Sequence, residues 1–242
     1  MEFFQNLVEY FDEFYPAETE ICSFFKELGK NYSFPPKLLQ IAAGSGSLAL
    51  HLAKSGLDVT GIETSQPLLD SANLKRRTQL LSIRFFKMSV LEMARFLGKG
   101  FYNVIFCINN RISFIRSKEL MVQFFADCRH LLSDDGILVL QLYNYNNFAE
   151  NSFEPLKKLS PRASLKTALS VENGKVSAIS QTIECAQNRQ IPILENEPVY
   201  HLTKEEIEEF AEKSGFNKVE FYSDFKKTAF SSESEEIVCI LS

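Results

Sequence analysis

The sequence predicts an α/β fold: a doubly wound, seven-stranded, mostly parallel sheet whose last strand is antiparallel. Between residues 37 and 142, segments of strand length alternate with helical segments, and the strand segments are apolar at nearly every position. Parallel strands covered by helices on both faces have this pattern. The last two strand segments, 218–222 and 236–241, are joined by a loop without helical periodicity, which predicts an antiparallel pair.

Length and composition fit one domain that folds alone. The chain has 242 residues, of which 45% are hydrophobic and 24% charged, so disordered and low-complexity classes are excluded. The net charge of −5 lacks the basic field that binding to nucleic acid requires. No apolar run reaches about 18 residues, and the acidic start is unlike a signal peptide. We therefore expect neither a nucleic-acid nor a membrane partner.

Cysteine and histidine usage argues against a metal site. The five cysteines are odd in number and far apart, without a C-x-x-C pair, which suits a reducing cytoplasm. The three histidines have no Cys, Asp or Glu partners at a ligating spacing, so no metal is expected.

The elements follow in order along the chain. Residues 1–34 predict a helical N-terminal cap of two short helices, because apolar residues recur at helical spacing between Phe3 and Leu28 and the pattern breaks at Pro16. A turn is expected at Asp134-Asp135-Gly136, before the fifth strand. The intervening helices are expected at 47–55, from Thr64 onward and at 117–132, and the first five strands at Lys37–Ile41, Asp58–Glu63, Arg84–Lys87, Tyr102–Asn109 and Ile137–Leu142.

An insertion interrupts this rhythm. Residues 164–200 alternate in polarity and contain turn sequences at 172–175 and 187–189, which predicts an antiparallel β meander. We expect it to act as a lid over a substrate pocket. The main fold resumes at Thr203, which forms a capping-box pattern with Glu206 before a helix that ends at Gly215.

Chemistry is concentrated at the end of the first two strands. Gly44 and Gly46 allow the backbone to pass close to a ligand that faces the N–H groups of the following helix. Glu63 ends the next strand 19 residues after Gly44, so its carboxylate is expected beside the glycine turn. A carboxylate can accept hydrogen bonds from both hydroxyls of a ribose, which favours an adenosine-containing ligand. The alternative is a simple tight turn, with Glu63 capping the next helix.

A dinucleotide is the rival ligand. The run from Gly44 to Ala49 also fits the G-x-G-x-x-A fingerprint, so an NAD-dependent oxidoreductase is one alternative. The helical residues before the motif and the roughly 100 residues after Leu142 leave little chain for a separate catalytic domain.

Several segments together resemble the class I S-adenosylmethionine-dependent methyltransferases that act on small molecules, which have a Rossmann-like fold. Segment 38–46 resembles the family's first motif, and 59–65 its ribose-binding strand end. Segments 86–92, 102–114 and 131–138 resemble the adenine-binding, methionine-binding and following segments, and 202–222 resembles the late helix and strand. The resemblance implies S-adenosyl-L-methionine as cofactor, methyl transfer by in-line displacement, and a monomer or homodimer. The cofactor-binding residues it implies are Ala42, Ala43, Gly44, Ser45, Gly46, Glu63, Thr64, Ser89, Val90, Cys107, Ile108 and Asn109.

Some positions depart from the family pattern. Gln40 and Ser89 replace acidic residues, and Ala42 replaces the first glycine, so that its methyl group narrows the approach to the ligand. These departures keep a second alternative open, a protein that binds S-adenosylmethionine without turnover.

The acceptor is expected to be a small molecule. If it must lose a proton, the candidate bases are Tyr15, Tyr143 and His201. Arg111, just past the cofactor strand, could bind an anionic group of the substrate, and Tyr145 is a further substrate-binding candidate. The competing interpretation is structural: packing or loop-anchoring tyrosines, a surface histidine before a helix cap, and a solvated arginine.

Overall fold

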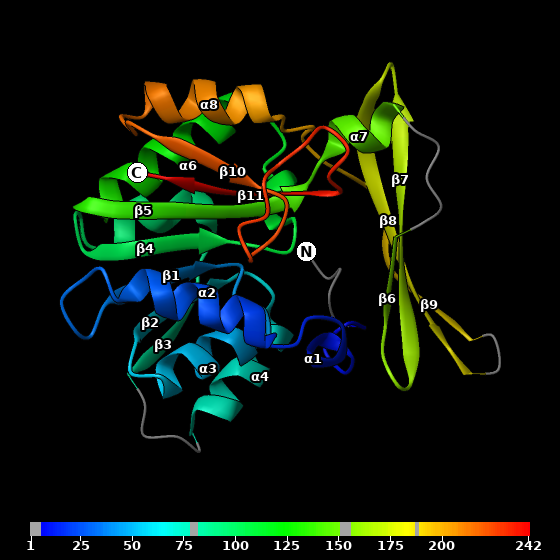
Figure 1. Cartoon of the computed structure of the whole chain (residues 1–242). Helices are drawn as coiled ribbons and strands as arrows, with labels where there is room; N and C mark the ends of the chain where they lie inside the picture. Colours follow the sequence, from blue (N-terminus) through cyan, green and yellow to red (C-terminus); the bar gives the residue numbers. More distant parts are fainter. Residues whose placement is uncertain (1–5, 78–81, 151–155, 187–188) are drawn as a thin grey trace.

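The computed structural model describes residues 6–77, 82–150, 156–186 and 189–242 (Figure 1). Its larger sheet has seven strands in the order β10-β11-β5-β4-β1-β2-β3. These strands are β1 (Lys37–Ile41), β2 (Asp58–Glu63), β3 (Ile83–Lys87), β4 (Tyr102–Cys107), β5 (Leu132–Tyr143), β10 (Val219–Tyr222) and β11 (Glu236–Leu241). The helices are α1 (Phe11–Phe14), α2 (Thr19–Gly29), α3 (Ser47–Lys54), α4 (Gln66–Arg77), α5 (Met93–Phe96), α6 (Lys118–Leu131), α7 (Tyr145–Glu150) and α8 (Lys204–Lys213), with 3-10 turns η1 (Val90–Glu92) and η2 (Arg111–Phe114).

The strand pairing confirms the predicted fold class. Strands β1 to β5 pair in parallel, whereas β11 runs antiparallel to both of its neighbours, β5 and β10. The order reverses at β1, so that β2 and β4 lie on either side of it. In open α/β sheets the crevice at the carboxyl ends of such strands is where ligands bind.

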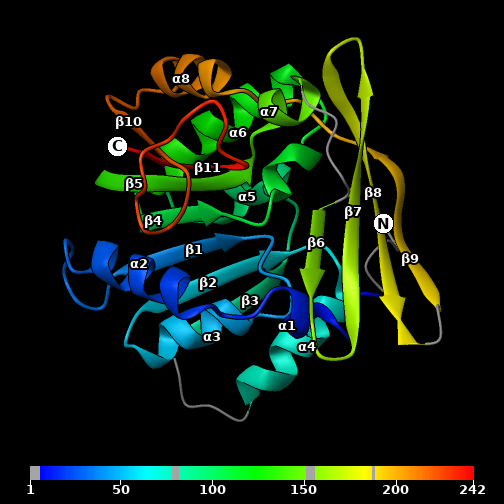
Figure 2. The same cartoon turned by 45° about the vertical axis from the view of Figure 1, so that its right-hand side comes forward.

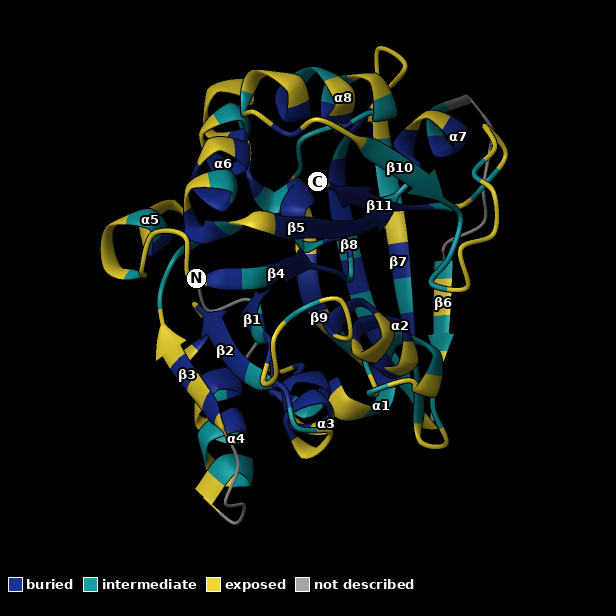
Figure 3. Ribbon diagram, turned by 60° about the vertical axis from the view of Figure 1, so that its left-hand side comes forward, coloured by how far each residue is buried: buried dark blue, intermediate teal, exposed yellow. Residues whose placement is uncertain are grey.

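Helices cover both faces of the larger sheet, which explains its continuous apolar strands. Helices α2, α3 and α4 pack in one buried cluster, where the ring of Phe25 packs at a tilt against Phe106 of β4 with centroids 4.2 Å apart. Helices α5, α6 and α8 pack in the other, where Phe125 meets Phe210 edge to face. Figure 3 shows buried central strands and helices exposed on their outer sides. Alternate residues of a strand enter opposite clusters, as Leu38 and Leu39 of β1 do.

Helix α8 begins as the sequence predicts. The Thr203 hydroxyl accepts a hydrogen bond from the Glu206 N–H at 3.2 Å. The Glu206 carboxylate accepts from the Tyr200 hydroxyl at 2.7 Å instead of completing the capping box. Leu202 and Ile207 are fully buried beside the cap, the arrangement of a hydrophobic staple.

The predicted turn at Asp134-Asp135-Gly136 is wrong. Strand β5 begins at Leu132 and continues through these residues. Its pairing with β4 shifts register between Tyr102 and Val104, whose partners are Leu132 and Ile137. Extra residues in one strand are absorbed as a bulge, so the polar turn sequence bends the strand without ending it.

The insertion forms a second, four-stranded antiparallel sheet in the order β6-β7-β8-β9. Its strands are β6 (Leu156–Leu159), β7 (Ala163–Glu172), β8 (Lys175–Cys185) and β9 (Gln190–Pro198). The meander at 164–200 was predicted, but β6 and α7 were not. A third buried cluster joins this sheet to α1 and α7 through side chains such as Phe14, Phe148 and Ile183. Figures 1 and 2 place α1 and this sheet beside the carboxyl ends of the parallel strands.

No helix in the described part of the chain is both long enough and apolar enough to span a membrane.

Candidate functional site

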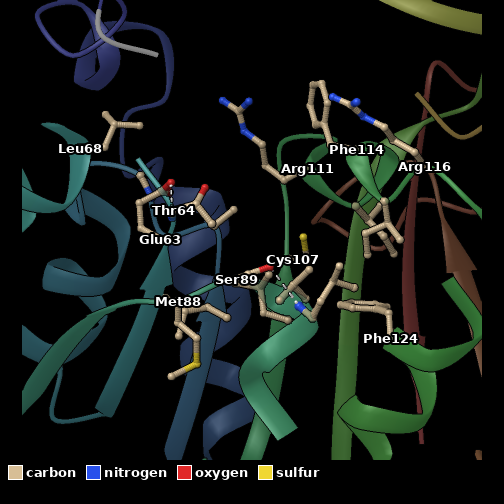
Figure 4. Close-up of a pocket in the computed structure, with 18 of the residues that line it drawn as sticks. Glu63, Thr64, Leu68, Met88, Ser89, Cys107, Arg111, Phe114, Arg116 and Phe124 are labelled. Atoms are coloured by element: carbon tan, nitrogen blue, oxygen red, sulfur yellow. Dashed lines mark hydrogen bonds between the residues drawn. The ribbon is translucent and has the colours of Figure 1, made fainter. Parts of the chain in front are cut away.

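A cavity of about 320 Å³ lies between the carboxyl ends of β1, β2 and β4 and the smaller sheet. Figure 4 shows Glu63, Thr64 and Leu68 on one side of it, Cys107 near its centre, and Phe114, Arg116 and Phe124 on the other side. Most of its wall is apolar. The charged side chains that line it are Glu63, Arg111, Arg116 and Glu197. The cavity therefore has one end at Glu63 and an opposite end at Arg116 and Glu197.

The glycine turn adopts a backbone that side chains disfavour. Ala42, Gly44 and Gly46 all have left-handed φ angles, of 54°, 59° and 77°, and such angles are strained for any residue except glycine. Gly44 also faces the ring of Phe11, since a Cβ atom there would lie 2.2 Å from Phe11 Cζ. Glycine at 44 is therefore required both by the turn and by the packing of α1 against it.

Glu63 links the end of β2 to this turn. Its side chain is buried, Oε2 accepts from the Gly44 N–H at 2.8 Å, and Oε1 accepts from Thr64 and Ser65 N–H at 2.8 and 2.9 Å. A carboxylate has about four acceptor positions, so these three donors leave about one. Glu63 can thus accept one further hydroxyl without losing a backbone bond, whereas the two ribose hydroxyls expected from the sequence would require an exchange.

The cavity wall between the end of β2 and η1 is largely apolar. Ile62, Met88 and Val90 lie in it, with Ser89 between the last two. The Ser89 hydroxyl accepts from Leu91 N–H at 3.3 Å and its N–H donates to Glu92 at 3.2 Å, which caps η1. Ser89 thus fixes the loop that forms one wall.

The structure brings together part of the predicted cofactor set. Ala43 and Ile108 instead point into the core beneath α3, and the Asn109 N–H donates to the side chain of Gln141. Ser45 and Gly46 belong to the turn but do not line the cavity. The predicted residues that do line it are Ala42, Gly44, Glu63, Thr64, Ser89, Val90 and Cys107. Burial raises the pKa of the Cys107 thiol to about 12, so this part of the wall is neutral.

Of the two predicted substrate residues, only Arg111 lines the cavity. Its guanidinium lies 5.4 Å from the centre of the Tyr15 ring. Tyr145 is buried, and its hydroxyl accepts from the Asn110 amide at 2.7 Å. Asn110 also accepts from the Tyr143 N–H at 3.1 Å, so Tyr145 supports the end of β5.

The three candidate bases do not line the cavity. His201 is held at both ring nitrogens: Nδ1 accepts from Val176 N–H at 2.8 Å, which leaves the Nε2 proton to bind Asn146 Oδ1 at 2.9 Å. Burial lowers the pKa of His201, which favours this neutral form. Burial also raises the pKa of Tyr143, and Tyr15 packs under Lys158, 4.5 Å from its ring centre. Their geometry fits structural roles.

Several lining residues escaped sequence analysis. Phe11 comes from the N-terminal cap, and Leu194 and Glu197 come from β9. Arg116 forms an ion pair with Glu197 across 81 residues of sequence. The only local signal was the nearness of Arg116 to Arg111, because the contact itself depends on where the smaller sheet docks.

Among the described residues, no group of three or more His, Cys, Asp or Glu side chains could hold a metal ion.

In comparisons with known sequences, the central part of the chain is similar to methyltransferases. The family model for the methyltransferase domain matches residues 38–136. A putative methyltransferase of Geobacillus sp. (strain WCH70) is 30% identical over 108 residues, which are 45% of this chain and 42% of that protein. The match therefore spans less than half the length of this relative. A glycine/sarcosine N-methyltransferase of Aphanothece halophytica is 24% identical over 237 residues, or 94% of this chain and 84% of the relative.

Solved structures share the whole fold. The CcbJ methyltransferase from Streptomyces caelestis has a TM-score of 0.79 at 19% identity, with 100% of this chain and 97% of that chain covered. The sugar N-methyltransferase KedS8 from Streptoalloteichus sp. has a TM-score of 0.65 at 14% identity, with 97% and 92% covered. At these identities the likeness establishes the architecture, including the four-stranded insertion within the aligned length.

Proposed function

We propose that this chain, whose residues 38–136 match the family model for the methyltransferase domain, is a class I S-adenosylmethionine-dependent methyltransferase that binds S-adenosyl-L-methionine in this cavity and methylates a small molecule there. One observation carries the proposal: the buried carboxylate of Glu63 accepts the Gly44 N–H at the end of an apolar cavity. The smaller sheet, which lies over the other end, is the proposed lid for the acceptor.

The residues present fit an adenosyl group. The remaining acceptor position of Glu63 suits a ribose hydroxyl, and the apolar side chains of Ile62 and Val90 in the cavity wall suit the adenine ring. Thr64 and Ser89 place hydroxyl groups along this part of the cavity. Ala42 lines the cavity at the glycine turn, where its methyl group occupies space that a glycine would leave open to the ligand. When bound, this cofactor supplies an electrophilic methyl group on a positively charged sulfur.

The protein's part in the reaction is alignment and exclusion of water. The cavity would hold the accepting atom in line with the methyl group that the cofactor supplies, so that the new bond could form as the carbon–sulfur bond breaks. Ile112, Phe114 and Phe124 wall the acceptor side, and a dry wall suits a reaction in which charge is dispersed. Holding the two reactants in line supplies much of the rate enhancement.

Nitrogen is the accepting atom that this cavity suits best. The tyrosines and the histidine considered as bases do not line it. An alcohol would need a base, whereas a bound ammonium group needs only to pass one proton to water or to a carboxylate before its lone pair can attack. The names of two similar proteins point the same way, a glycine/sarcosine N-methyltransferase and a sugar N-methyltransferase. We therefore propose an N-methyltransferase of a small-molecule amine.

A protein that binds the cofactor without turnover is the second candidate. It is favoured by Ala42 in the cavity wall and by Gln40, whose buried Oε1 has no hydrogen-bond partner in the part of the chain the structure describes. Methyl release to a panel of small amines distinguishes this candidate from an enzyme.

Isothermal titration with S-adenosylmethionine, its demethylated product and NADH tests the cofactor. We expect the first two to bind and NADH not to bind. Glu63→Ala should weaken binding about 10- to 100-fold, since it removes a hydrogen bond to a charged group. Asp58→Ala, at the opposite end of β2 and paired with Arg84, is the control and should bind normally. Binding of NADH alone, or an unchanged affinity in Glu63→Ala, would refute the proposal.

A further inference from the structure

Glu197 is a buried carboxylate at the acceptor end of the cavity. Its side chain is 8% exposed, and it lines the same wall as Leu194 and Phe114. Burying a carboxylate among apolar groups is costly unless a cation balances it. Glu63, the other carboxylate in the cavity wall, is already occupied by backbone N–H groups at the cofactor end.

A bulge in β9 turns Glu197 toward the cavity. Leu194 pairs with Gln181 and Glu197 pairs with Ile179, so three steps along β9 match two along β8. Asn196 lies in this bulge and has a left-handed φ of 49°. Its N–H donates to the Ser180 hydroxyl at 2.9 Å and its side chain accepts from Ser170 at 3.2 Å. Without the bulge, residues three apart would face opposite sides, whereas Leu194 and Glu197 both line the cavity.

The cation that balances Glu197 is Arg116, which can move away from it into solvent. Arg116 pairs with it, yet the Arg116 side chain is 50% exposed. Its guanidinium can therefore return to water without the cost that would attend a buried arginine. The acceptor-side wall offers Arg116 and Arg111 as cations and Glu197 as its carboxylate.

We infer that Glu197 recognises the amino group of the acceptor and exchanges its Arg116 partner for that nitrogen when the acceptor binds. This inference rests on the proposed function, since it names the residue that selects amines at the same site. The acceptor binds as its ammonium ion, whose charge takes the place of the guanidinium. It then passes one proton to water, keeps its remaining N–H donors on the carboxylate, and has a lone pair free to attack the methyl carbon.

The exchange also explains selection against alcohols. A hydroxyl group carries no charge and donates one hydrogen bond, so it cannot replace the guanidinium. Glu197 then keeps Arg116, and an alcohol gains nothing from the carboxylate. Specificity arises because the wrong acceptor leaves the buried charge with its original partner.

The test uses protein saturated with the demethylated cofactor and matched amine and hydroxyl probes: glycine with glycolate, ethanolamine with ethylene glycol, and glucosamine with glucose. Affinities are measured by titration or saturation-transfer NMR. We expect at least one amine to bind more than about tenfold more tightly than its hydroxyl partner, and Glu197→Gln to remove that preference. Glu195→Gln, an exposed neighbour on the same strand, is the matched control and should keep it.

Arg116→Gln separates recognition from simple fastening of the lid. If Glu197 exchanges partners, removing Arg116 removes its competitor, so glucosamine and ethanolamine should bind at least as tightly as to the wild type. If the pair only fastens the lid, Arg116→Gln and Glu197→Gln should weaken all probes alike, and the inference fails. It also fails if no amine binds to the loaded protein. If the wild-type protein does not bind the demethylated cofactor at all, the proposed function itself is refuted.

Discussion

Ala42 shows how one residue can shape both the turn and the cavity. It adopts a left-handed φ of 54° and lines the cavity. A left-handed conformation costs a residue with a Cβ atom roughly 1–2 kcal/mol. The alanine predicted from sequence to narrow the approach is therefore also a point of local strain. Its neighbour Ala43 has an ordinary φ and is buried in the core.

We expect Ala42→Gly to raise the free energy of unfolding by up to about 1 kcal/mol, because relief of strain exceeds the added freedom of the unfolded chain. Ala43→Gly should lower it by about 1 kcal/mol, because a buried methyl group is lost without any relief. Urea denaturation of the two variants measures both changes. Equal losses in the two would show that residue 42 is not strained.

Helix α1 is too short to be stable alone. Its position therefore depends on contacts with the larger sheet on one side and the smaller sheet on the other. Asp12 accepts from Ser45, from Ser47 at 2.7 Å and from Lys75 at 2.5 Å. On the other side, Glu13 pairs with Arg162 between β6 and β7. Helix α1 therefore joins the glycine turn to the smaller sheet, and its Phe11 closes one side of the cavity.

Asp12→Asn should be less stable than the wild type at pH 7 but not at low pH. Burial raises the pKa of Asp12, yet hydrogen bonds from Lys75, Ser45 and Ser47 outweigh this and hold it below the ordinary 3.8. A depressed pKa stabilises the folded state above pH 3.8, and this stabilisation is lost as the pH falls through the folded-state value. Because Asp12 is half exposed, we expect a difference under about 1 kcal/mol.

Unfolding free energies of both proteins at pH 7 and pH 3 measure this change. A difference that stays the same at the two pH values would contradict the charge-dependent contact. Lys75→Gln should destabilise Asp12→Asn less than it destabilises the wild type at pH 7, because the Lys75–Asp12 ion pair is already lost in Asp12→Asn whereas the hydrogen bonds of Lys75 to Ser45 and Ser47 remain.

The cavity is a property of the whole molecule, because its walls come from parts of the chain that are far apart. The larger sheet supplies the turn, Glu63 and Cys107, helix α1 supplies Phe11, and the smaller sheet supplies Leu194 and Glu197. A ligand that filled this cavity would contact all three parts, so binding should stabilise them together.

Hydrogen exchange with and without the demethylated cofactor tests this coupling. We expect slower exchange at the glycine turn and also in α1, whose Phe11 packs against Gly44. Strand β10, at the far edge of the larger sheet, should exchange at the same rate in both states and serves as the internal control. Protection limited to the turn would mean that α1 does not close over the ligand.

The sequence alone determined the seven-stranded fold, the antiparallel last strand and the pairing of the glycine turn with Glu63. These depend on local periodicity, on turn residues and on the rule that parallel strands end at one edge, all of which a linear pattern records. Only the tertiary structure decided that Phe11, Arg116 and Glu197 share the cavity and that Tyr143, Tyr145 and His201 do not line it. The reason is register: a bulge of one residue in β9 reverses the side on which Glu197 lies, and the docking of separate segments leaves no local trace.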